Sequence, residues 1–266
     1  MQDIKTMQMN NRRPCYLIVG GVAGGATAAA RLRRLTEDAE IILFEKGEHI
    51  SYANCGLPYY IGGVIEERDR LFVQTPQAFE KRFQVDVRTQ SEVIAIDRVG
   101  KSVRVKTADG REYTEPYDKL LLSPGASPVR PPLPGIGLEG IFTLRNVSDT
   151  DRIKSFIAER GVGRAVIVGA GFIGLEMAEN LKEAGAEVAV VEMADQVMAP
   201  IDFSMASFVH QHLLEHGVQL YLEQAVESFS QEEGELIVHL KLGIALKTDL
   251  VLLSIGVRPE TRLAEE

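Results

Sequence analysis

The sequence contains little cysteine and no long apolar run. Only two of its 266 residues are cysteines, Cys15 and Cys55, and they show neither CxxC nor metal-ligand spacing. A disulfide framework is therefore not expected, and reduced cysteines are typical of a cytoplasmic protein. No stretch reaches the roughly 20 apolar residues of a membrane span. Residues 1–13 lack the apolar centre of a secretory signal, and we interpret them as a disordered leader.

The charge balance excludes some classes of partner, and the length limits the number of domains. Lys and Arg number 29 against 38 Asp and Glu, a formal net charge of −9, which is unsuited to nucleic acid or to an anionic membrane surface. No metal site is predicted, because His212 and His216 have no third ligand in the pattern around them. A chain of 266 residues provides one large domain or two ordinary ones.

The most informative pattern is an internal repeat. The first copy consists of an apolar run, the glycine-rich turn 20–25, a helical stretch and a second apolar run that ends at Glu45. The second copy has the same order, with its turn at 169–174 and its acid at Glu192. Strand, glycine turn, helix, strand and acid form a βαβ dinucleotide-binding unit. The sequence therefore predicts an α/β fold with two Rossmann-like, three-layer domains.

The residue types in each copy suit a bound dinucleotide. Glycines let the backbone approach a pyrophosphate, and N–H groups at the helix N-terminus receive its charge. The acid accepts hydrogen bonds from ribose hydroxyls and repels a 2′-phosphate, so Glu192 predicts NADH rather than NADPH. The alternative is a pair of glycine-rich turns in an unrelated α/β fold. The predicted cofactor-binding residues of the two copies are Gly20, Val22, Ala23, Gly24, Glu45, Gly169, Gly171, Ile173, Gly174 and Glu192.

The first copy departs from the standard fingerprint. Val22 occupies the position of the middle glycine, so the backbone there must lie slightly differently against a pyrophosphate. Between the copies, the pattern predicts strands at 93–96 and 103–106 with a turn at Asp109-Gly110. The proline-rich stretch 128–137 predicts a stiff linker and a domain edge.

The segment Ser51–Tyr60 places Cys55 shortly after the first repeat, and here the sequence resembles the pyridine nucleotide-disulfide oxidoreductases. These are flavoproteins of the glutathione reductase-like type. The sequence is most similar to their single-cysteine branch, because Tyr60 stands where two-cysteine members carry the second cysteine of a CxxxxC pair. Within that branch it is most similar to the coenzyme A-disulfide reductases, because Ser51-x-x-Asn54-Cys55 matches their coenzyme A-contacting segment. Four segments carry the resemblance: 19–35, 44–62, 117–126 and 165–192.

The resemblance implies a division of the chain and a set of site residues. Residues 14–148 would form an FAD-binding domain and residues 149–266 an NAD(P)H-binding domain. Cys55 and Asn54 would be catalytic, with Phe172 as a gate over the nicotinamide and Glu176 beside it; ordinary helix packing is the alternative for Phe172. Further FAD contacts are implied at Lys46, Val93, Ser123 and Gly125. Contacts to coenzyme A are implied at Thr27, Arg31, Arg34, Ser51 and Asn54; for the arginines the alternative is a solvated helix face.

The resemblance also implies a reaction. An FAD-dependent enzyme would use NADH, with NADPH less favoured, to reduce coenzyme A disulfide or a related persulfide through a mixed disulfide between Cys55 and coenzyme A. Two alternatives remain: an NADH oxidase or polysulfide reductase using the same cysteine, and a non-catalytic redox-sensing module. Ala23 counts against the oxidase, because relatives with that chemistry carry histidine at this position.

Relatives in this family continue beyond the position matching Pro259. A second FAD segment and a dimerisation domain follow there, so the FAD-binding domain is expected to be incomplete in this chain. We expect the chain to be a piece of a longer protein that forms a homodimer through that absent C-terminal domain; the alternative is a natural chain that ends early.

Overall fold

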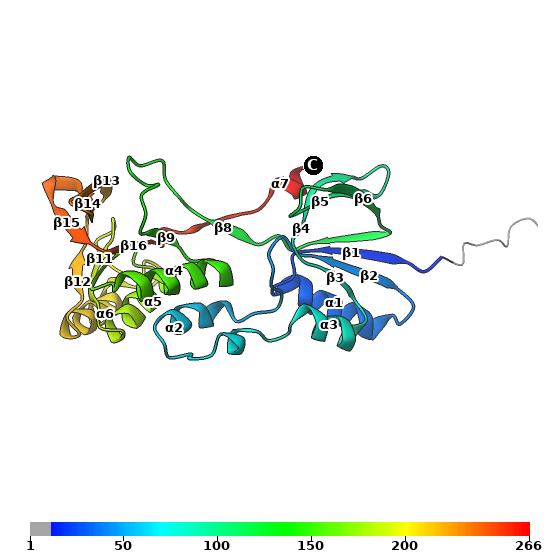
Figure 1. The fold of residues 1–266 in the computed structure, drawn as a ribbon, viewed down its shortest axis with the longest axis horizontal. Helices are drawn as coiled ribbons and strands as arrows, with labels where there is room; N and C mark the ends of the chain where they lie inside the picture. The colour runs from blue at the N-terminus through cyan, green and yellow to red at the C-terminus, as the bar shows by residue number, and fades with distance from the viewer. Residues whose placement is uncertain (1–11) are drawn as a thin grey trace, which may run out of the picture. The chain divides into compact units, whose positions relative to one another are not determined.

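A computed structural model describes residues 12–266 as two compact units (Figure 1). Most of the predicted leader, residues 1–11, lies outside the described residues. The first unit comprises the described residues up to Tyr52, Phe72–Gly125 and Pro259–Glu266. The second comprises Ala53–Leu71 and Ala126–Arg258.

This division differs from a single boundary near residue 148, and packing explains the difference. Residues 126–148 supply an edge strand to the second unit, whereas Leu263 near the C-terminus packs in the core of the first. In the stretch expected to be a stiff linker, Leu133 and Ile136 pack half-buried against the core of the second unit, as does Leu138 just beyond it. These side chains are apolar, so burial fixes the segment on one unit despite its prolines.

The first unit is built on a four-stranded parallel sheet in the order β3-β2-β1-β7. Side chains alternate along β1, so that Ile18 faces the helices while Leu17 and Val19 face a second, antiparallel sheet. The strands of the parallel sheet are β1 (Cys15–Val19), β2 (Glu40–Phe44), β3 (Asp86–Arg88) and β7 (Lys119–Leu122).

Helices and a meander complete three layers in this unit (Figure 1). Helices α1 (Gly24–Leu35) and α3 (Pro76–Phe83) cover one face, where Ala26, Ala29 and Phe79 are buried. The meander covers the other face, and the short helix α7 (Arg262–Glu265) packs beside it. Its strands are β4 (Ser91–Asp97), β5 (Ser102–Thr107) and β6 (Glu112–Pro116), with the predicted turn at Asp109-Gly110 between the last two.

The second unit repeats this plan around a five-stranded parallel sheet in the order β12-β11-β10-β16-β9. An antiparallel sheet packs on one face through Phe229, Leu236 and Val238. The strands of the parallel sheet are β9 (Ile141–Thr143), β10 (Arg164–Val168), β11 (Glu187–Val191), β12 (Gln219–Tyr221) and β16 (Leu250–Leu253). Those of the antiparallel sheet are β13 (Val226–Glu232), β14 (Glu235–Leu240) and β15 (Ala245–Thr248), with a 3₁₀ turn, η3 (Lys241–Gly243).

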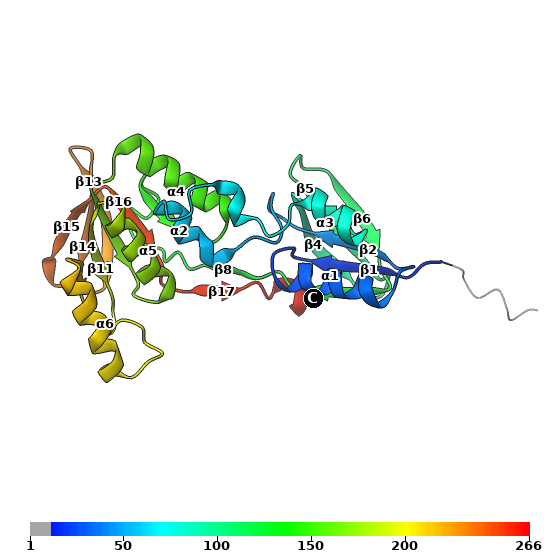
Figure 2. The same cartoon turned by 90° about the horizontal axis from the view of Figure 1, so that it is seen from below.

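Helices α4 (Val147–Arg160), α5 (Phe172–Glu183) and α6 (Phe203–Glu215) contact the strands of the parallel sheet. A capping box starts α4, because the Asn146 side chain accepts a hydrogen bond from the Asp149 N–H at 2.9 Å. The short helix α2 (Leu57–Ile61) packs on α4 and α5 (Figure 2). The remaining elements are η1 (Asn54–Gly56), η2 (Arg68–Leu71), β8 (Ala126–Pro128) and β17 (Val257–Pro259), the last two pairing with each other.

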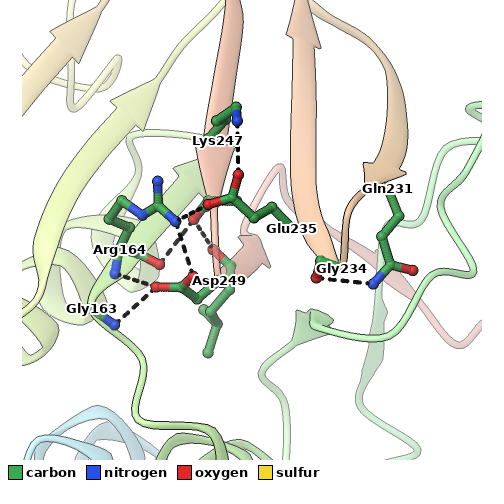
Figure 3. Close-up of polar contacts among 9 residues, drawn as sticks. Gly163, Arg164, Gln231, Gly234, Glu235, Lys247 and Asp249 are labelled. Atoms are coloured by element: carbon green, nitrogen blue, oxygen red, sulfur yellow. Dashed lines mark hydrogen bonds and ion pairs between the residues drawn. The ribbon is translucent and has the colours of Figure 1, made fainter.

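An ion-pair network joins β10 to the antiparallel sheet of the second unit (Figure 3). Glu235 accepts hydrogen bonds from Arg164 and from Lys247, each at 2.8 Å. Asp249 accepts the backbone N–H groups of Gly163 and Arg164 at 2.9 and 2.8 Å. The Arg164 and Lys247 hydrogen bonds lower the pKa of Glu235 from its ordinary value of 4.5 to about 2.

We expect Glu235→Gln to lower the melting temperature at pH 7, and this difference to shrink as the pH falls below 4.5. The pKa of Glu235 is lower in the folded state, so its ion pairs stabilise the fold above the ordinary pKa. That stability is lost as the carboxylate takes up a proton near pH 2. Thermal unfolding between pH 7 and 3 measures the effect. Glu227→Gln, at an exposed position on β13, is the control; a difference that does not change with pH contradicts the prediction.

Candidate functional site

The glycine turn of the second unit links β10 to α5 and is held tightly. Gly169 has a φ of +101°, and a Cβ there would meet the Ser254 carbonyl oxygen at 2.5 Å. A Cβ on Gly174 would overlap the Gly169 carbonyl oxygen. A Cβ on Gly171 would meet nothing within 4 Å. Two glycines therefore close the turn, while the third leaves its outer side free for a ligand.

Glu192 follows β11 and is hydrogen-bonded to this turn. Its carboxylate accepts the Ala170 N–H at 2.8 Å and the Ala194 N–H at 2.9 Å, one at each oxygen. Each carboxylate oxygen has a second lone pair, which leaves acceptor capacity for ribose hydroxyls. Glu192 thus holds the glycine turn in place and can still accept hydrogen bonds from ribose hydroxyls, as its position in the motif predicts.

A cavity of about 530 Å³ lies at the carboxyl ends of these strands. Gly169, Gly171 and Glu192 line it together with residues that the sequence did not indicate, including Gln224 and Phe229. In open α/β sheets, ligands bind beyond the carboxyl ends of the strands. The cavity, the glycine turn and the acid fit the adenosine diphosphate part of a dinucleotide.

The first unit reproduces the same turn. A Cβ on Gly20, which has a φ of +94°, would overlap the Ser123 carbonyl oxygen, and a Cβ on Gly25 would overlap the Gly20 carbonyl oxygen. The Glu45 carboxylate accepts the N–H groups of Gly21 and Gly47, each at 2.8 Å. Gly25 therefore corresponds to Gly174. Its place five residues after Gly20 was the signal that could have identified it.

The remaining predicted FAD contacts gather around this turn. Lys46 and Val93 line a cavity of about 90 Å³ together with Gly20 and Glu45. Residues near the C-terminus, which the sequence did not indicate, complete its wall: Glu260, Arg262 and Leu263. Val22 and Ala23 directly precede α1, Gly24 is its first residue, and Ser123 and Gly125 follow β7. The glycine cradle and the acid fit a dinucleotide here as well.

The predicted coenzyme A contacts on α1 share one exposed face. Thr27, Arg31 and Arg34 are all exposed, and within residues 12–266 neither arginine forms a hydrogen bond or an ion pair. Arg33 behaves differently, because it donates to the carbonyl oxygens of Phe83 and Gln84 at 2.9 and 2.8 Å. Arg33 thus ties α1 to the end of α3, whereas the other two arginines are available to a ligand.

Ser51 lies beside the glycine turn of the first unit. Its N–H donates to the Gly21 carbonyl oxygen at 3.0 Å, and its φ is +47°, a left-handed conformation that is uncommon for serine. Its own carbonyl oxygen accepts the Val73 N–H at 2.8 Å. These bonds hold Ser51 in a conformation that an isolated chain would disfavour.

Cys55 and Asn54 are exposed, and they lie in η1 on the second unit. The segment that carries them is fastened there. Lys154 of α4 donates to the Tyr60 carbonyl oxygen at 2.5 Å and lies over the Tyr60 ring, with Nζ 3.8 Å from its centroid. Arg68 forms a bidentate pair with Asp151, with a shortest distance of 2.7 Å. The thiol is therefore accessible on an anchored backbone.

Cys15 presents the opposite environment. It is the first residue of β1, is 2% exposed, and burial, with a smaller contribution from Glu40, raises its pKa to about 11. A thiol with this pKa stays protonated at neutral pH and reacts slowly. Of the two cysteines, only Cys55 is presented to solvent.

Acidic groups on α5 lie close to α2. Burial, followed by the charge of Glu179, raises the pKa of Glu176. The charge of Glu176 is in turn the main reason why the pKa of Tyr59 is raised. Phe172 lies one turn before Glu176 and is 64% exposed, so packing in the core does not account for it. Ile173 beside it is 40% exposed.

No group of three or more His, Cys, Asp or Glu side chains within 12–266 is arranged to hold a metal ion. Among the helices formed by these residues, none has the length and apolar character needed to cross a membrane.

Residues 15–266 match the family described as pyridine nucleotide-disulphide oxidoreductase. The chain belongs to this family. The two glycine turns, one on each α/β unit, agree with membership of this family. The fold class expected from the sequence is confirmed.

Relatives within the pyridine nucleotide-disulphide oxidoreductases are similar along nearly the whole chain. A coenzyme A disulfide reductase of Staphylococcus aureus is 37% identical over 255 residues, covering 95% of this chain and 56% of the relative. An NADH oxidase of Methanocaldococcus jannaschii is 36% identical over 251 residues, covering 94% and 56%. The solved structure of reduced CoADR-RHD from Bacillus anthracis has 52% identity and a TM-score of 0.92, covering 96% of this chain and 46% of that one. The chain therefore spans about half the length of these relatives.

Proposed function

We propose that this chain carries the FAD site, the NADH site and the reactive thiol of an NADH-dependent reductase of coenzyme A disulfide or a related persulfide. The observation that carries the proposal is the accessible, anchored Cys55 on the unit whose glycine turn and Glu192 fit a nicotinamide dinucleotide. The similarity to a coenzyme A disulfide reductase supports it.

In the proposed reaction, the Cys55 thiolate attacks one sulfur of coenzyme A disulfide. A Cys55–coenzyme A disulfide forms, and one coenzyme A thiolate leaves. Two electrons from NADH then break that bond, which returns the Cys55 thiolate and releases the second coenzyme A, while NADH is oxidised to NAD⁺. FAD, when bound, supplies the electron transfer between nicotinamide and sulfur. Asn54, next to the thiol and exposed, would help position the sulfur.

Residues of each unit would hold their ligands by the contacts described above. Glu192 would accept the ribose hydroxyls of NADH, and its charge would repel the additional phosphate of NADPH. Phe172 would cover the nicotinamide pocket beside Glu176. Arg31 and Arg34, free on one face of α1, suit the phosphates of coenzyme A by bidentate geometry, with Thr27 and Ser51 as further contacts, named here from the family resemblance. We further propose that the whole protein acts in the cytoplasm as a homodimer.

The test is the intact mass of freshly purified protein under non-reducing conditions. We expect a coenzyme A adduct that dithiothreitol removes, that is absent from Cys55→Ser and that is retained by the matched variant Cys15→Ser. The accessible thiol forms the disulfide, whereas the thiol with a pKa of about 11 does not. An adduct that persists in Cys55→Ser contradicts the assignment of the reactive residue.

A second candidate is an NADH oxidase that uses the same thiol. The similarity to the oxidase of M. jannaschii favours it, while Ala23 in the first glycine turn counts against it. Cys55 carrying only added oxygen atoms, together with NADH-dependent oxygen consumption, would support the oxidase. Binding of both cofactors without NADH consumption would indicate a redox sensor.

A further inference from the structure

The loop between β11 and α6 (Figure 2) forms part of the wall of the dinucleotide cavity. It spans residues 193–202, contains no helix or strand, and contributes Met193, Ala199 and Pro200 to the cavity. Met198 in this loop has a φ of +52°, a left-handed conformation that is uncommon for a residue with a side chain. Such a conformation persists only where surrounding contacts hold it, so the contacts of the loop determine the shape of this wall.

His210 of α6 provides one of these contacts. Its Nε2 atom accepts a hydrogen bond from the Val197 N–H at 3.0 Å. Val197 is fully buried, so without the imidazole this N–H would have no water molecule to replace its partner. Because a backbone N–H only donates, Nε2 carries no proton, and the ring is the neutral tautomer with its proton on Nδ1. The Phe203 ring lies edge-on to the imidazole, with centroids 6.1 Å apart.

The next residue of the loop holds the glycine turn. The Met198 N–H donates to the carbonyl oxygen of Ala170, which directly precedes Gly171, at 2.9 Å. In a trans peptide the N–H points opposite to the C=O of the preceding residue, so this bond turns the Gly171 N–H away from the loop. Gly171 is the N-cap of α5, where backbone N–H groups receive a phosphate. Because Val197 and Met198 are adjacent, the bond to His210 helps to determine where the Met198 N–H points.

We propose that His210 is a positioning residue for the pyrophosphate of NADH. This inference rests on the proposed NADH site of the second unit. The imidazole fixes the loop, the loop fixes a carbonyl group of the glycine turn, and the N–H of Gly171 is thereby oriented toward the phosphate oxygens. His210 does not line the cavity, so it acts through the loop rather than by touching the ligand. Its role is separate from that of Glu192, which would bind the ribose.

The test separates the acceptor atom of His210 from its ring. His210→Phe keeps an aromatic ring beside Phe203 but leaves the Val197 N–H without an acceptor. His210→Gln loses the ring but carries Oε1 at the same number of bonds from Cβ as Nε2. Calorimetric titration with NAD⁺ measures affinity without hydride transfer. We expect His210→Phe to bind NAD⁺ about tenfold more weakly than the wild type, and His210→Gln to remain within about twofold of it.

A second ligand locates the effect within the cavity. Adenosine contains the base and the ribose of the adenine side but no pyrophosphate. We therefore expect the affinity of His210→Phe for adenosine to stay within about twofold of the wild-type value, since the lost orientation concerns phosphate binding. A loss as large for adenosine as for NAD⁺ would show that His210 supports the whole cavity, and would overturn the inference.

The matched controls are His212→Phe and His212→Gln. His212 is exposed on the same helix, and its ring packs on that of His216, with centroids 4.2 Å apart. These variants should match the wild type. Equal weakening of NAD⁺ binding in His210→Phe and His210→Gln overturns the inference; if the phenylalanine variant does not fold, His210→Leu replaces it in the same comparison. Wild-type protein that does not bind NAD⁺ overturns the NADH site itself, whereas normal binding with an unaffected His210→Phe overturns only the role of His210.

Discussion

Replacement of Glu192 by arginine is expected to raise the ratio of NADP⁺ to NAD⁺ affinity by about 100-fold. The change removes the repulsion between a carboxylate and a 2′-phosphate, and it supplies a guanidinium that pairs with phosphate in bidentate geometry. Glu192 also accepts two hydrogen bonds from the turn, so absolute affinities should fall for both dinucleotides while the ratio rises. Titration calorimetry with each dinucleotide measures the ratio.

Glu192→Gln is the control for the loss of charge alone. The amide keeps the size and an acceptor oxygen, so we expect a smaller rise in the ratio than arginine gives. If the ratio stays at the wild-type value in Glu192→Arg, the acid does not face the adenine-side ribose, and the assignment of the second unit to a nicotinamide dinucleotide loses its main support.

The second large effect is a difference in stability between alanine substitutions at Gly174 and Gly171, two glycines of the same turn. Gly174→Ala should destabilise the second unit by about 3 kcal/mol, because its Cβ would overlap the backbone oxygen of Gly169, which cannot move aside as a side chain can. Gly171→Ala should leave stability within about 0.5 kcal/mol, since the new Cβ meets nothing within 4 Å. It should nevertheless weaken NAD⁺ binding, because the methyl group occupies the side from which a pyrophosphate approaches.

Urea unfolding gives the stabilities, and titration with NAD⁺ gives the affinities. Equal losses of stability in the two variants would show that the turn is uniformly packed, against the geometry described above. Full NAD⁺ binding by Gly171→Ala would mean that the pyrophosphate lies elsewhere. Val22 occupies the corresponding position in the first unit, so that unit already tolerates a side chain there.

The two dinucleotide units were predictable because their chemistry demands particular residue types at fixed spacing. Glycine is needed where a turn leaves no room for a Cβ, and an acid is needed where ribose hydroxyls lie. Gly25 was not identified because the turn contains three other glycines, so the sequence alone did not show which of them belong to the motif. Gln224 could not be found at all, since a single glutamine after a short strand shows no pattern, and only the folded structure brings it to the wall of the cavity beside Glu192.

The division into units could not be predicted from local patterns. Prolines indicated a linker at 128–137, yet Leu133 and Ile136 within this stretch pack half-buried against the core of the second unit. The attachment of Ala53–Leu71 to the second unit depends on Lys154 and Arg68–Asp151, contacts between residues more than 80 positions apart. Such long-range pairing follows from the assembled surface rather than from the adjacent sequence.

The anchoring of Ala53–Leu71 makes the two units interleaved along the polypeptide. The thiol segment is encoded between two stretches of the first unit, although it folds as part of the second. No single break in the chain separates the units into intact bodies, since a break after Gly125 leaves the thiol segment covalently joined to one product and packed on the other. Gene fusion or recombination at one junction therefore cannot exchange the nucleotide unit together with its thiol, because the chain passes between the two units four times.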